Sequence, residues 1–292
     1  MNRIKGILYA AVSSSTFGLA PFFSITLLLA GFSAFEVLSY RWGVASIVLI
    51  VFGWLSGCNF RLAGKDWGVV FLLSLLRAVT SFSLIIAYQN IASGVASTIH
   101  FMYPLAVALA MMFFFREKKS LLVILAVLMS LLGAALLSLG ELEAKSGNTM
   151  VGLVAACVSV FSYAGYIVGV RTTRAVQINS TALTCYVMGL GTIFYLIGAY
   201  CTSGLQLVSD GYTWLIILGL ALPATAISNI TLVQAIKYAG PTLISILGAM
   251  EPLTAVVIGV FVFKELFTVN SAVGIILILL AVSIVVFRRQ KS

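Results

Sequence analysis

The sequence predicts an all-α integral membrane protein, with ten transmembrane helices arranged as two inverted five-helix repeats (5+5) around a central cavity. Three observations predict this fold: an apolar composition, charge-poor segments of membrane-spanning length, and a pattern that occurs twice. Hydrophobic residues make up 62% of the 292 residues and charged residues only 9%, and the mean hydropathy is +1.16. A soluble domain carries roughly 25% charged residues. This chain has too few to cover a globule in water, so we expect lipid to be its solvent.

The placement of the basic residues, behind a formal net charge of +9, and the scarcity of metal-binding residues argue against nucleic-acid-binding proteins and metalloproteins. A nucleic-acid-binding domain needs a basic patch on a soluble surface, whereas these basic residues lie at the ends of apolar segments, so no nucleic acid is expected. The four cysteines lack CxxC spacing and His100 is the only histidine, so we expect no metal and no cofactor. The expected partners are the lipid bilayer and a small-molecule substrate. The oligomeric state is left open between monomer and dimer, because a single GxxxG pair, Gly165 and Gly169, is weak support for dimerisation.

The apolar segments have the length that a bilayer requires. A hydrocarbon core of about 30 Å is crossed by roughly 20 helical residues. The stretch 67–115 is too long for one helix, and its polar residues Gln89, Asn90, Ser93 and Gly94 divide it into two. The expected spans are 6–29, 35–56, 67–88, 93–115, 120–139, 150–170, 180–203, 212–236, 240–263 and 268–287.

The basic residues predict the orientation of these spans. With the N-terminus in the cytoplasm, only Lys145 and Lys264 fall outside, and Arg41 and Arg77 lie within spans. An excess of Lys and Arg marks cytoplasmic loops. We therefore expect a multi-pass protein of the plasma membrane, taken as a bacterial inner membrane, with both termini cytoplasmic. The basic residues placed on the cytoplasmic side are Arg3, Lys5, Arg61, Lys65, Arg116, Lys118, Lys119, Arg171, Arg174, Lys237, Arg288, Arg289 and Lys291.

The two halves of the chain share a pattern. Residues 104–117 (PLAVALAMMFFFRE) align without gaps with residues 252–265 (PLTAVVIGVFVFKE), and Gly6 and Ala10 of the first span match Gly152 and Ala156 of the sixth. These matches predict one repeat at 6–139 and a second at 150–287. Because each repeat has an odd number of helices, the second must cross the membrane inverted, which is a recurring plan among transporters.

These features together resemble a known family. Two five-helix repeats, each with a proline inside its fourth helix (Pro104, Pro252) and a basic residue followed by glutamate before its fifth, are similar to the EamA-type members of the drug/metabolite transporter superfamily. The resemblance covers residues 6–139 and 150–287 and rests more on architecture than on one signature. It implies a ten-helix carrier with a cavity between the repeats that moves amino acids, other metabolites or drugs, commonly as an exporter.

Ionisable residues inside the expected spans are candidates for the substrate site. An ionisable group at the bilayer centre costs at least about 2.5 kcal/mol, so it is expected to face a cavity or a partner. At about 1.5 Å per residue, Arg77, Glu251 and His100 all lie near the middle of the membrane, where alternating-access carriers bind their substrates.

Other polar and small residues share helix faces with these groups. The sixth span contributes Tyr163 and Tyr166, and the eighth contributes Asn229. In the fourth span Tyr103 adjoins Pro104, and in the ninth Gly248 precedes Pro252. We expect the three tyrosines and Asn229 to contact substrate, and Pro104, Pro252 and Gly248 to act as structural or hinge positions, because prolines and small residues allow helices to bend or approach.

Structural explanations exist for the same residues. Arg77 and Glu251 could form an ion pair that joins the halves, and His100 could hydrogen-bond a neighbouring helix. Tyr103 could be core packing. Arg41 lies near the outer end of its span, where its side chain could reach the interface or pair with Glu36.

The favoured function is a secondary carrier, in the direction of export, for small polar or zwitterionic metabolites such as amino acids or their derivatives. An arginine complements a carboxylate and a carboxylate complements an ammonium group. No Walker-type glycine loop occurs, so we expect gradients of substrate or protons, with Glu251 or His100 as the group to protonate, rather than ATP hydrolysis. A passive channel is the alternative. An intramembrane enzyme is disfavoured because no nucleophile–base pair or carboxylate cluster stands out.

Overall fold

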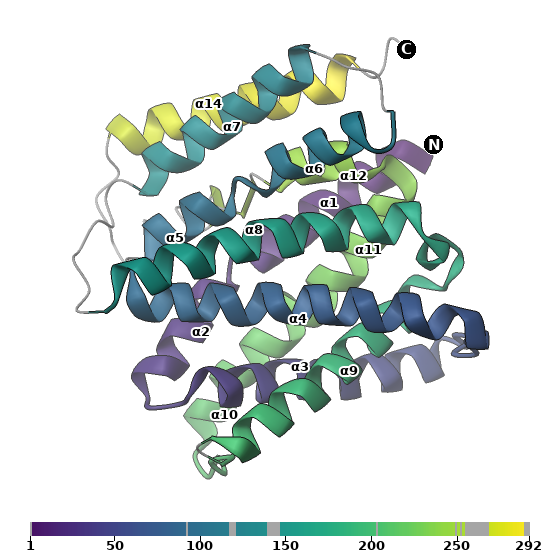
Figure 1. Ribbon diagram of the computed structural model, residues 1–292, viewed down its shortest axis with the longest axis vertical. Helices are drawn as coiled ribbons and strands as arrows, with labels where there is room; N and C mark the ends of the chain where they lie inside the picture. Colours follow the sequence, from purple (N-terminus) through teal and green to yellow (C-terminus); the bar gives the residue numbers. More distant parts are fainter. Residues whose placement is uncertain are drawn as a thin grey trace.

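A computed structural model describes residues 2–91, 93–116, 121–138, 147–202, 204–248, 250–251, 253–254 and 269–288 (Figure 1). Within these ranges every regular element is a helix. The elements are α1 (Asn2–Phe17), α2 (Ala20–Leu29), α3 (Ala34–Leu55), η1 (Gly64–Asp66), α4 (Trp67–Asn90), α5 (Ser93–His100), α6 (Tyr103–Phe113), α7 (Leu121–Ser138), α8 (Thr149–Thr172), η3 (Arg174–Gln177), α9 (Ser180–Cys201), α10 (Gly211–Ala221), the π-helical η4 (Leu222–Ile227), α11 (Ser228–Ala239), α12 (Pro241–Leu247) and α14 (Val269–Arg288).

Six helical segments are long and apolar enough to cross a membrane, and each coincides with an expected span. Four further expected spans, 93–115, 120–139, 240–263 and 268–287, overlap shorter helices or extend outside the described residues, so the count of ten stays a prediction. The apolar helices shorter than a full span are Tyr103–Phe113, Leu121–Gly133 and Ala272–Ala281. The six long segments are Ile4–Leu29, Ala34–Leu55, Gly64–Asn90, Thr149–Thr172, Ser180–Cys201 and Gly211–Ala239.

The polarity of the surface and interior is that of a protein dissolved in lipid. Large apolar side chains lie on the outside, such as Trp54 at 78% exposed and Leu121 at 84%. Charged and polar side chains lie inside, including Arg77 at 1% and Asn229 at 0%. A hydrocarbon solvent supplies no hydrogen bonds, so polar groups gather where the protein can supply them. The composition therefore correctly indicated a membrane protein.

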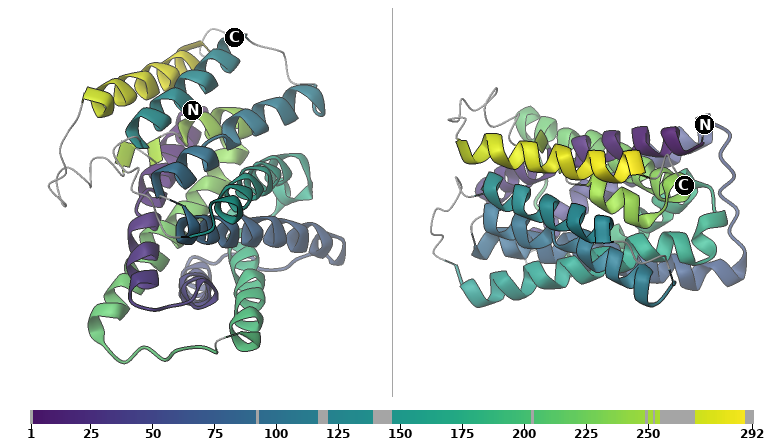
Figure 2. Two further views of the ribbon diagram at one scale, coloured as in Figure 1. Left: turned by 60° about the vertical axis from the view of Figure 1, so that its left-hand side comes forward. Right: turned by 90° about the horizontal axis from the view of Figure 1, so that it is seen from above.

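The bundle is organised by four extensive helix pairs. α4 packs on α8, α7 on α14, α1 on α11, and α3 on α9. In Figure 1 the α4–α8 pair crosses the centre of the molecule, α3 and α9 lie on one side of it, and α7 and α14 on the other. The right-hand view of Figure 2 shows most helices running in broadly the same direction, as expected when they cross one membrane. The core lies between α4, α8 and the interrupted helices.

Three of the segments are interrupted near their middles. α1 ends at Phe17 and α2 begins at Ala20, with Pro21 in its first turn, where proline lacks the N–H that a continuous helix would need. α10 passes into α11 through the π-helical turn η4, which contains Pro223. α5 ends at His100, and α6 begins with Tyr103 and Pro104. These interruptions free backbone groups in the interior, where side chains can bind them.

Glycines let the central helices pack closely. A Cβ atom built on Gly191 of α9 would lie 2.1 Å from the Trp42 ring of α3. Gly169 of α8 faces α4, where its Cβ would lie 2.7 Å from the Leu73 side chain, and Gly165 meets Leu76 of the same helix. The GxxxG pair thus packs against α4 of the same chain, and its geometry gives no support to a dimer.

The contact between Gly191 and Trp42 leads to a stability prediction. We expect Gly191→Ala to lower the melting temperature in detergent by roughly 3–10 °C, because the methyl group overpacks the α3–α9 contact. Gly189→Ala is the matched control, because Gly189 lies two residues earlier on the same helix and a Cβ built on it meets nothing within 4 Å. Equal melting temperatures for the two variants would show that α3 and α9 do not pack in this way.

Candidate functional site

Arg77 of α4 is the most enclosed charged group of the interior. Its Nε donates to Oδ1 of Asn229 at 3.1 Å, and Nη1 donates to the hydroxyl of Ser81 at 3.4 Å. Asn229 is held in turn by its Nδ2, which donates to the carbonyl of Thr225 at 2.7 Å. The Asn229 amide thus links α4 to the backbone released by the π-turn of the α10–α11 helix.

Aromatic rings surround the Arg77 guanidinium. Its Cζ lies 5.0 Å from the ring centroid of Tyr163, 5.9 Å from that of Tyr166 and 5.4 Å from that of Phe17. The two tyrosines come from successive turns of α8, and Phe17 is the last residue of α1. Ring faces attract a cation, most strongly when both are shielded from water. The rings therefore help to keep a positive charge in an apolar interior.

Arg41 of α3 is a second buried cation, at 4% exposed. Its Nε donates to the hydroxyl of Thr225 at 2.7 Å, and Nη2 contacts the carbonyl of Ala224 at 3.5 Å. The Thr225 hydroxyl donates onward to the carbonyl of Leu220, five residues earlier and in the last turn of α10. Arg41 therefore binds the turn directly.

The placement of Arg41 corrects one sequence-based explanation. The side chain does not pair with Glu36, because the Glu36 carboxylate accepts hydrogen bonds from the backbone N–H groups of Ser33 (2.8 Å) and Gln206 (2.7 Å). Ser33 and Glu36 form a capping box at the start of α3. With the carboxylate occupied at the helix end, Arg41 turns inward to the π-turn.

His100 lies at the end of α5 against α8. Its Nδ1 is 2.9 Å from the hydroxyl of Ser159, which itself donates to the carbonyl of Ala156 at 2.6 Å. The serine proton is thus engaged, and Nδ1 donates to the serine oxygen. The other ring nitrogen, Nε2, is buried and has no hydrogen-bond partner among the described residues. His100 therefore joins two helices while leaving one nitrogen for another group.

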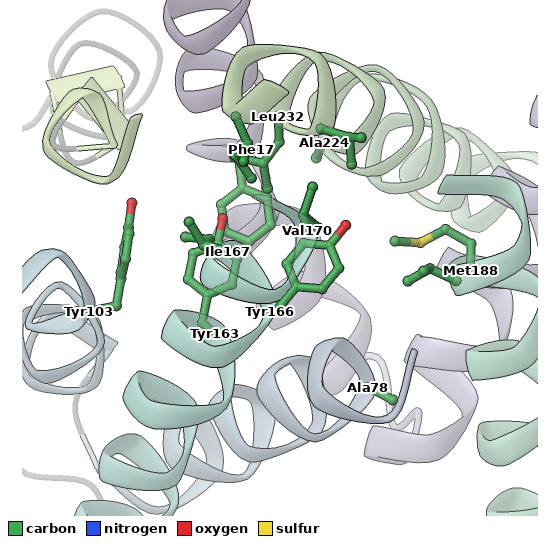
Figure 3. Packing of buried hydrophobic residues seen from close by; sticks show 14 of the residues in the cluster. Phe17, Ala78, Tyr103, Tyr163, Tyr166, Ile167, Val170, Met188, Ala224 and Leu232 are labelled. Atoms are coloured by element: carbon green, nitrogen blue, oxygen red, sulfur yellow. The ribbon is translucent and has the colours of Figure 1, made fainter. Parts of the chain in front are cut away.

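The tyrosines form an aromatic wall between α6 and α8 (Figure 3). Tyr103 meets the Tyr163 ring edge to face at 4.7 Å, and the His100 ring stacks on Tyr163 at 5.3 Å. The Tyr166 hydroxyl is buried without a hydrogen-bond partner in the described part of the chain. Figure 3 shows Tyr163 and Tyr166 side by side, and the Tyr103 hydroxyl directed away from its own helix.

Gly248 and Pro104 lie at contacts between interrupted helices. Gly248 follows the last residue of α12, and a Cβ built on it would lie 1.7 Å from the Tyr103 hydroxyl oxygen, so a larger residue would require the Tyr103 side chain to move. Pro104 is in the first turn of α6, directly after the break that follows His100. Pro252, the third expected hinge, lies outside the described residues.

Glu251 is 7% exposed and lies near the α1–α2 break. A Cβ built on Gly18, the residue after α1, would lie 2.7 Å from the Glu251 carbonyl oxygen. The Glu251 carboxylate interacts electrostatically with Arg77 and Tyr103. Within the described ranges it forms no hydrogen bond and no ion pair. The direct Arg77–Glu251 ion pair considered from the sequence is therefore not formed in this conformation.

A small cavity of about 20 Å³ lies beside the two arginines. This volume is enough for a water molecule but not for a metabolite. This cavity is therefore too small to hold a cargo in this conformation. The cavity is lined by Phe17, Ala20, Pro21, Ser24, Arg41, Arg77, Thr80, Ser81, Leu84, Ile85 and Tyr88.

Most of the site residues predicted from the sequence thus lie in one region of the structure, and several further residues contact them there. Arg77, Asn229, Tyr163 and Tyr166 contact one another directly or through one partner, as do His100, Tyr103 and Tyr163. The residues added are Phe17, Arg41, Ser81 and Thr225. Chemically, the region offers fixed guanidinium donors, a carboxylate and ring faces. Among the described residues no three His, Cys, Asp or Glu side chains gather into a metal site.

Comparisons with known proteins agree with this architecture. The sequence profile of the EamA-like transporter family matches residues 4–139 and again 150–287. A solved crystal structure, described only as that of a protein, aligns with a TM-score of 0.81 at 18% identity, over 100% of this chain and 99% of the other. At this identity the likeness shows the fold alone. No protein of curated function matches the sequence closely. The double match confirms the resemblance inferred from the repeats: the chain is a multi-pass membrane protein that belongs to the EamA-like transporter family of the drug/metabolite transporter superfamily.

Proposed function

We propose that the protein is a secondary transporter of small polar or zwitterionic metabolites, such as amino acids or their derivatives, and that it works by alternating access in the direction of export. The observation that carries this proposal is the enclosure of Arg77 and Glu251 in one interior region without a direct ion pair. A cation and a carboxylate held apart can bind the two charged ends of one amino acid. If Arg77 and Glu251 formed an ion pair with each other, their charges would be less available to bind such a cargo.

The proposed architecture is ten helices in two inverted repeats, 6–139 and 150–287. Inversion would relate α1–α2 to α8, α3 to α9, α4 to α10–α11, and α7 to α14. Under this relation the contact of α1 with α11 becomes the contact of α8 with α4, while the α3–α9 and α7–α14 contacts map onto themselves. These are the four most extensive helix contacts. Because the inversion maps these four contacts onto one another or onto themselves, they support a two-fold axis in the membrane plane.

The proposed location is the plasma membrane, a bacterial inner membrane, with both termini in the cytoplasm. In Figure 1 the start of α1 and the end of α14 lie at the same edge of the bundle. The connections α3–α4 and α8–α9, which carry Arg61, Lys65, Arg171 and Arg174, lie at that edge as well. An edge rich in basic residues is expected to face the cytoplasm.

The interrupted helices support the proposal of alternating access. The α1–α2 break touches the Glu251 backbone, and the π-turn of α10–α11 holds Arg41 and Asn229. Broken helices in carriers bring backbone groups to the substrate and let half-helices tilt. Rotation of α2 about the break would open the small cavity to one side of the membrane, and tilting of α12 would open the Glu251 region to the other. Gradients of substrate or protons, with Glu251 or His100 as the protonated group, would supply the energy.

The first test identifies the cargo and separates a carrier from a passive channel. Metabolite profiling of cells with and without the chain should show the cargo depleted inside cells that contain it. In proteoliposomes, unlabelled cargo inside should then accelerate the entry of labelled cargo, because only a carrier couples the two fluxes. Saturable exchange is the expected result. Linear, unaccelerated flux would instead show a channel.

The second test concerns Glu251. We expect Glu251→Gln to abolish exchange while its melting temperature stays within about 2 °C of wild type, because the carboxylate bonds none of the described residues. Glu36→Gln is the matched control: it weakens the capping box and the bond to Gln206, so it should lower stability while the folded fraction still exchanges cargo. A destabilised Glu251→Gln that retains exchange would assign Glu251 a structural role.

The third test concerns orientation. In a variant without the four native cysteines, Gln177→Cys between α8 and α9 should react with an impermeant maleimide only from the cytoplasm. Ser209→Cys before α10 should react only from outside, because one span separates the two exposed positions. Labelling of both cysteines from the same side would rule out the proposed orientation of the second half.

A further inference from the structure

Arg41 and Arg77 face the same aromatic ring. The Arg41 Cζ lies 5.5 Å from the Phe17 ring centroid and the Arg77 Cζ lies 5.4 Å from it. The two charges therefore cannot be further apart than the sum of these distances. They come from neighbouring spans, α3 and α4, and both side chains are buried. Two like charges at this range in a low-dielectric interior repel each other, so an arrangement of this kind needs a compensating group.

Ring faces and uncharged acceptors stabilise the two arginines, but within the described residues neither arginine bonds an anion. Arg41 donates to one hydroxyl and contacts one carbonyl, and Arg77 donates to one amide oxygen and one hydroxyl, all of them uncharged. A guanidinium carries more N–H donors than these contacts use. Of the nearby carboxylates, that of Glu36 is occupied at the start of α3 and that of Glu251 forms no ion pair with either arginine. Among the described residues, this region therefore holds two cations, Arg41 and Arg77, and the one carboxylate of Glu251.

Polar side chains border the small cavity. Both arginines line it, together with the hydroxyl-bearing side chains of Ser24, Thr80 and Ser81. The Thr80 and Ser81 hydroxyls are positioned by bonds to Ser162 and to Arg77, respectively. Bidentate guanidinium groups flanked by hydroxyls bind planar oxyanions strongly. The cavity measures about 20 Å³, so it must widen before a carboxylate can enter. A tilt of α2 away from α4 at the α1–α2 break would widen it.

We propose that Arg41 and Arg77 form a carboxylate-binding subsite and that the cargo is an amino acid with two carboxylates, hence a net anion. One carboxylate would lie between the two arginines, the other would contact Arg77, and the ammonium group would face Glu251. This cargo balances the two cations and the one carboxylate. The inference deepens the proposed function and rests on it, because it names the charge class of the cargo at that same site.

The test compares L-glutamate with L-glutamine, which differs from it in one charge and hardly in shape. In proteoliposome exchange, wild type should reach half-maximal rate at an L-glutamate concentration at least about tenfold below that for L-glutamine, as expected for a hydrogen-bonded charge pair. Arg41→Gln should raise the L-glutamate concentration for half-maximal exchange about tenfold and reduce the preference for L-glutamate over L-glutamine. Arg61→Gln, the same change on an exposed cytoplasmic loop, should leave both values unchanged.

Thermal stabilisation of the detergent-purified protein provides a second measurement. L-Glutamate should raise the melting temperature of wild type but not of Arg41→Gln. If Arg41→Gln does not fold, Arg41→Lys, which retains the charge but loses the bidentate geometry, should fold and show an intermediate preference. Stabilisation by inorganic phosphate in place of L-glutamate would overturn the carboxylate assignment.

The two proposals can fail separately. If wild type exchanges L-glutamine or L-alanine as well as L-glutamate, and Arg41→Gln does the same, the anionic subsite is wrong while the carrier stands. If L-glutamate stabilises wild type through Arg41 but no amino acid is exchanged, the subsite stands and the transport proposal fails. Absence of both exchange and stabilisation with L-glutamate would overturn the proposed cargo.

Discussion

The interior of this protein depends on the retention of the Arg77 charge in a membrane. No hydrocarbon solvent can bind a guanidinium, so every stabilising contact must come from the chain. Asn229 and Ser81 accept its hydrogen bonds, and Tyr163, Tyr166 and Phe17 present ring faces to it. These partners come from α1, α4, α8 and α11. A single cation therefore requires four segments from both halves of the chain to stay together.

The interrupted helices follow from the same requirement. A regular helix satisfies its own backbone and presents only side chains to its neighbours. The π-turn of α10–α11 releases the Ala224 carbonyl to Arg41, while the Thr225 hydroxyl bonds both Arg41 and the helix backbone. Across the interior, the α1–α2 break lets the Glu251 backbone approach Gly18 within contact distance. The breaks thus provide polar backbone and close approach at the depth where charged side chains lie, and they also make those segments the ones able to bend.

The sequence predicted the spans more fully than the contacts of the site. Hydrophobicity and charge determine where a helix can cross, and this information is local, so six long segments were located correctly. The direction of the Arg41 side chain depends instead on a residue far away in the sequence. From its position near a helix end, Arg41 could reach the membrane interface. The structure directs it inward, because its hydrogen-bond partner Thr225 lies there. The Ser33–Glu36 capping box was a readable signal that Glu36 had other partners. Phe17 gave no signal, because an apolar ring in an apolar segment does not reveal that it faces two cations.

The charge arrangement also bears on how a carrier of this design would avoid cycling empty. A ligand shifts a conformational equilibrium only by the difference between its affinities for the two states. Arg41 and Arg77 lie against one ring, so closing an unloaded site around them would bring like charges together in a medium of low dielectric. An anionic cargo would remove that repulsion and gain hydrogen bonds in the same step. Closure would then be favoured by loading, and the loaded carrier would change sides faster than the empty one, which is the kinetic condition for exchange in place of leakage.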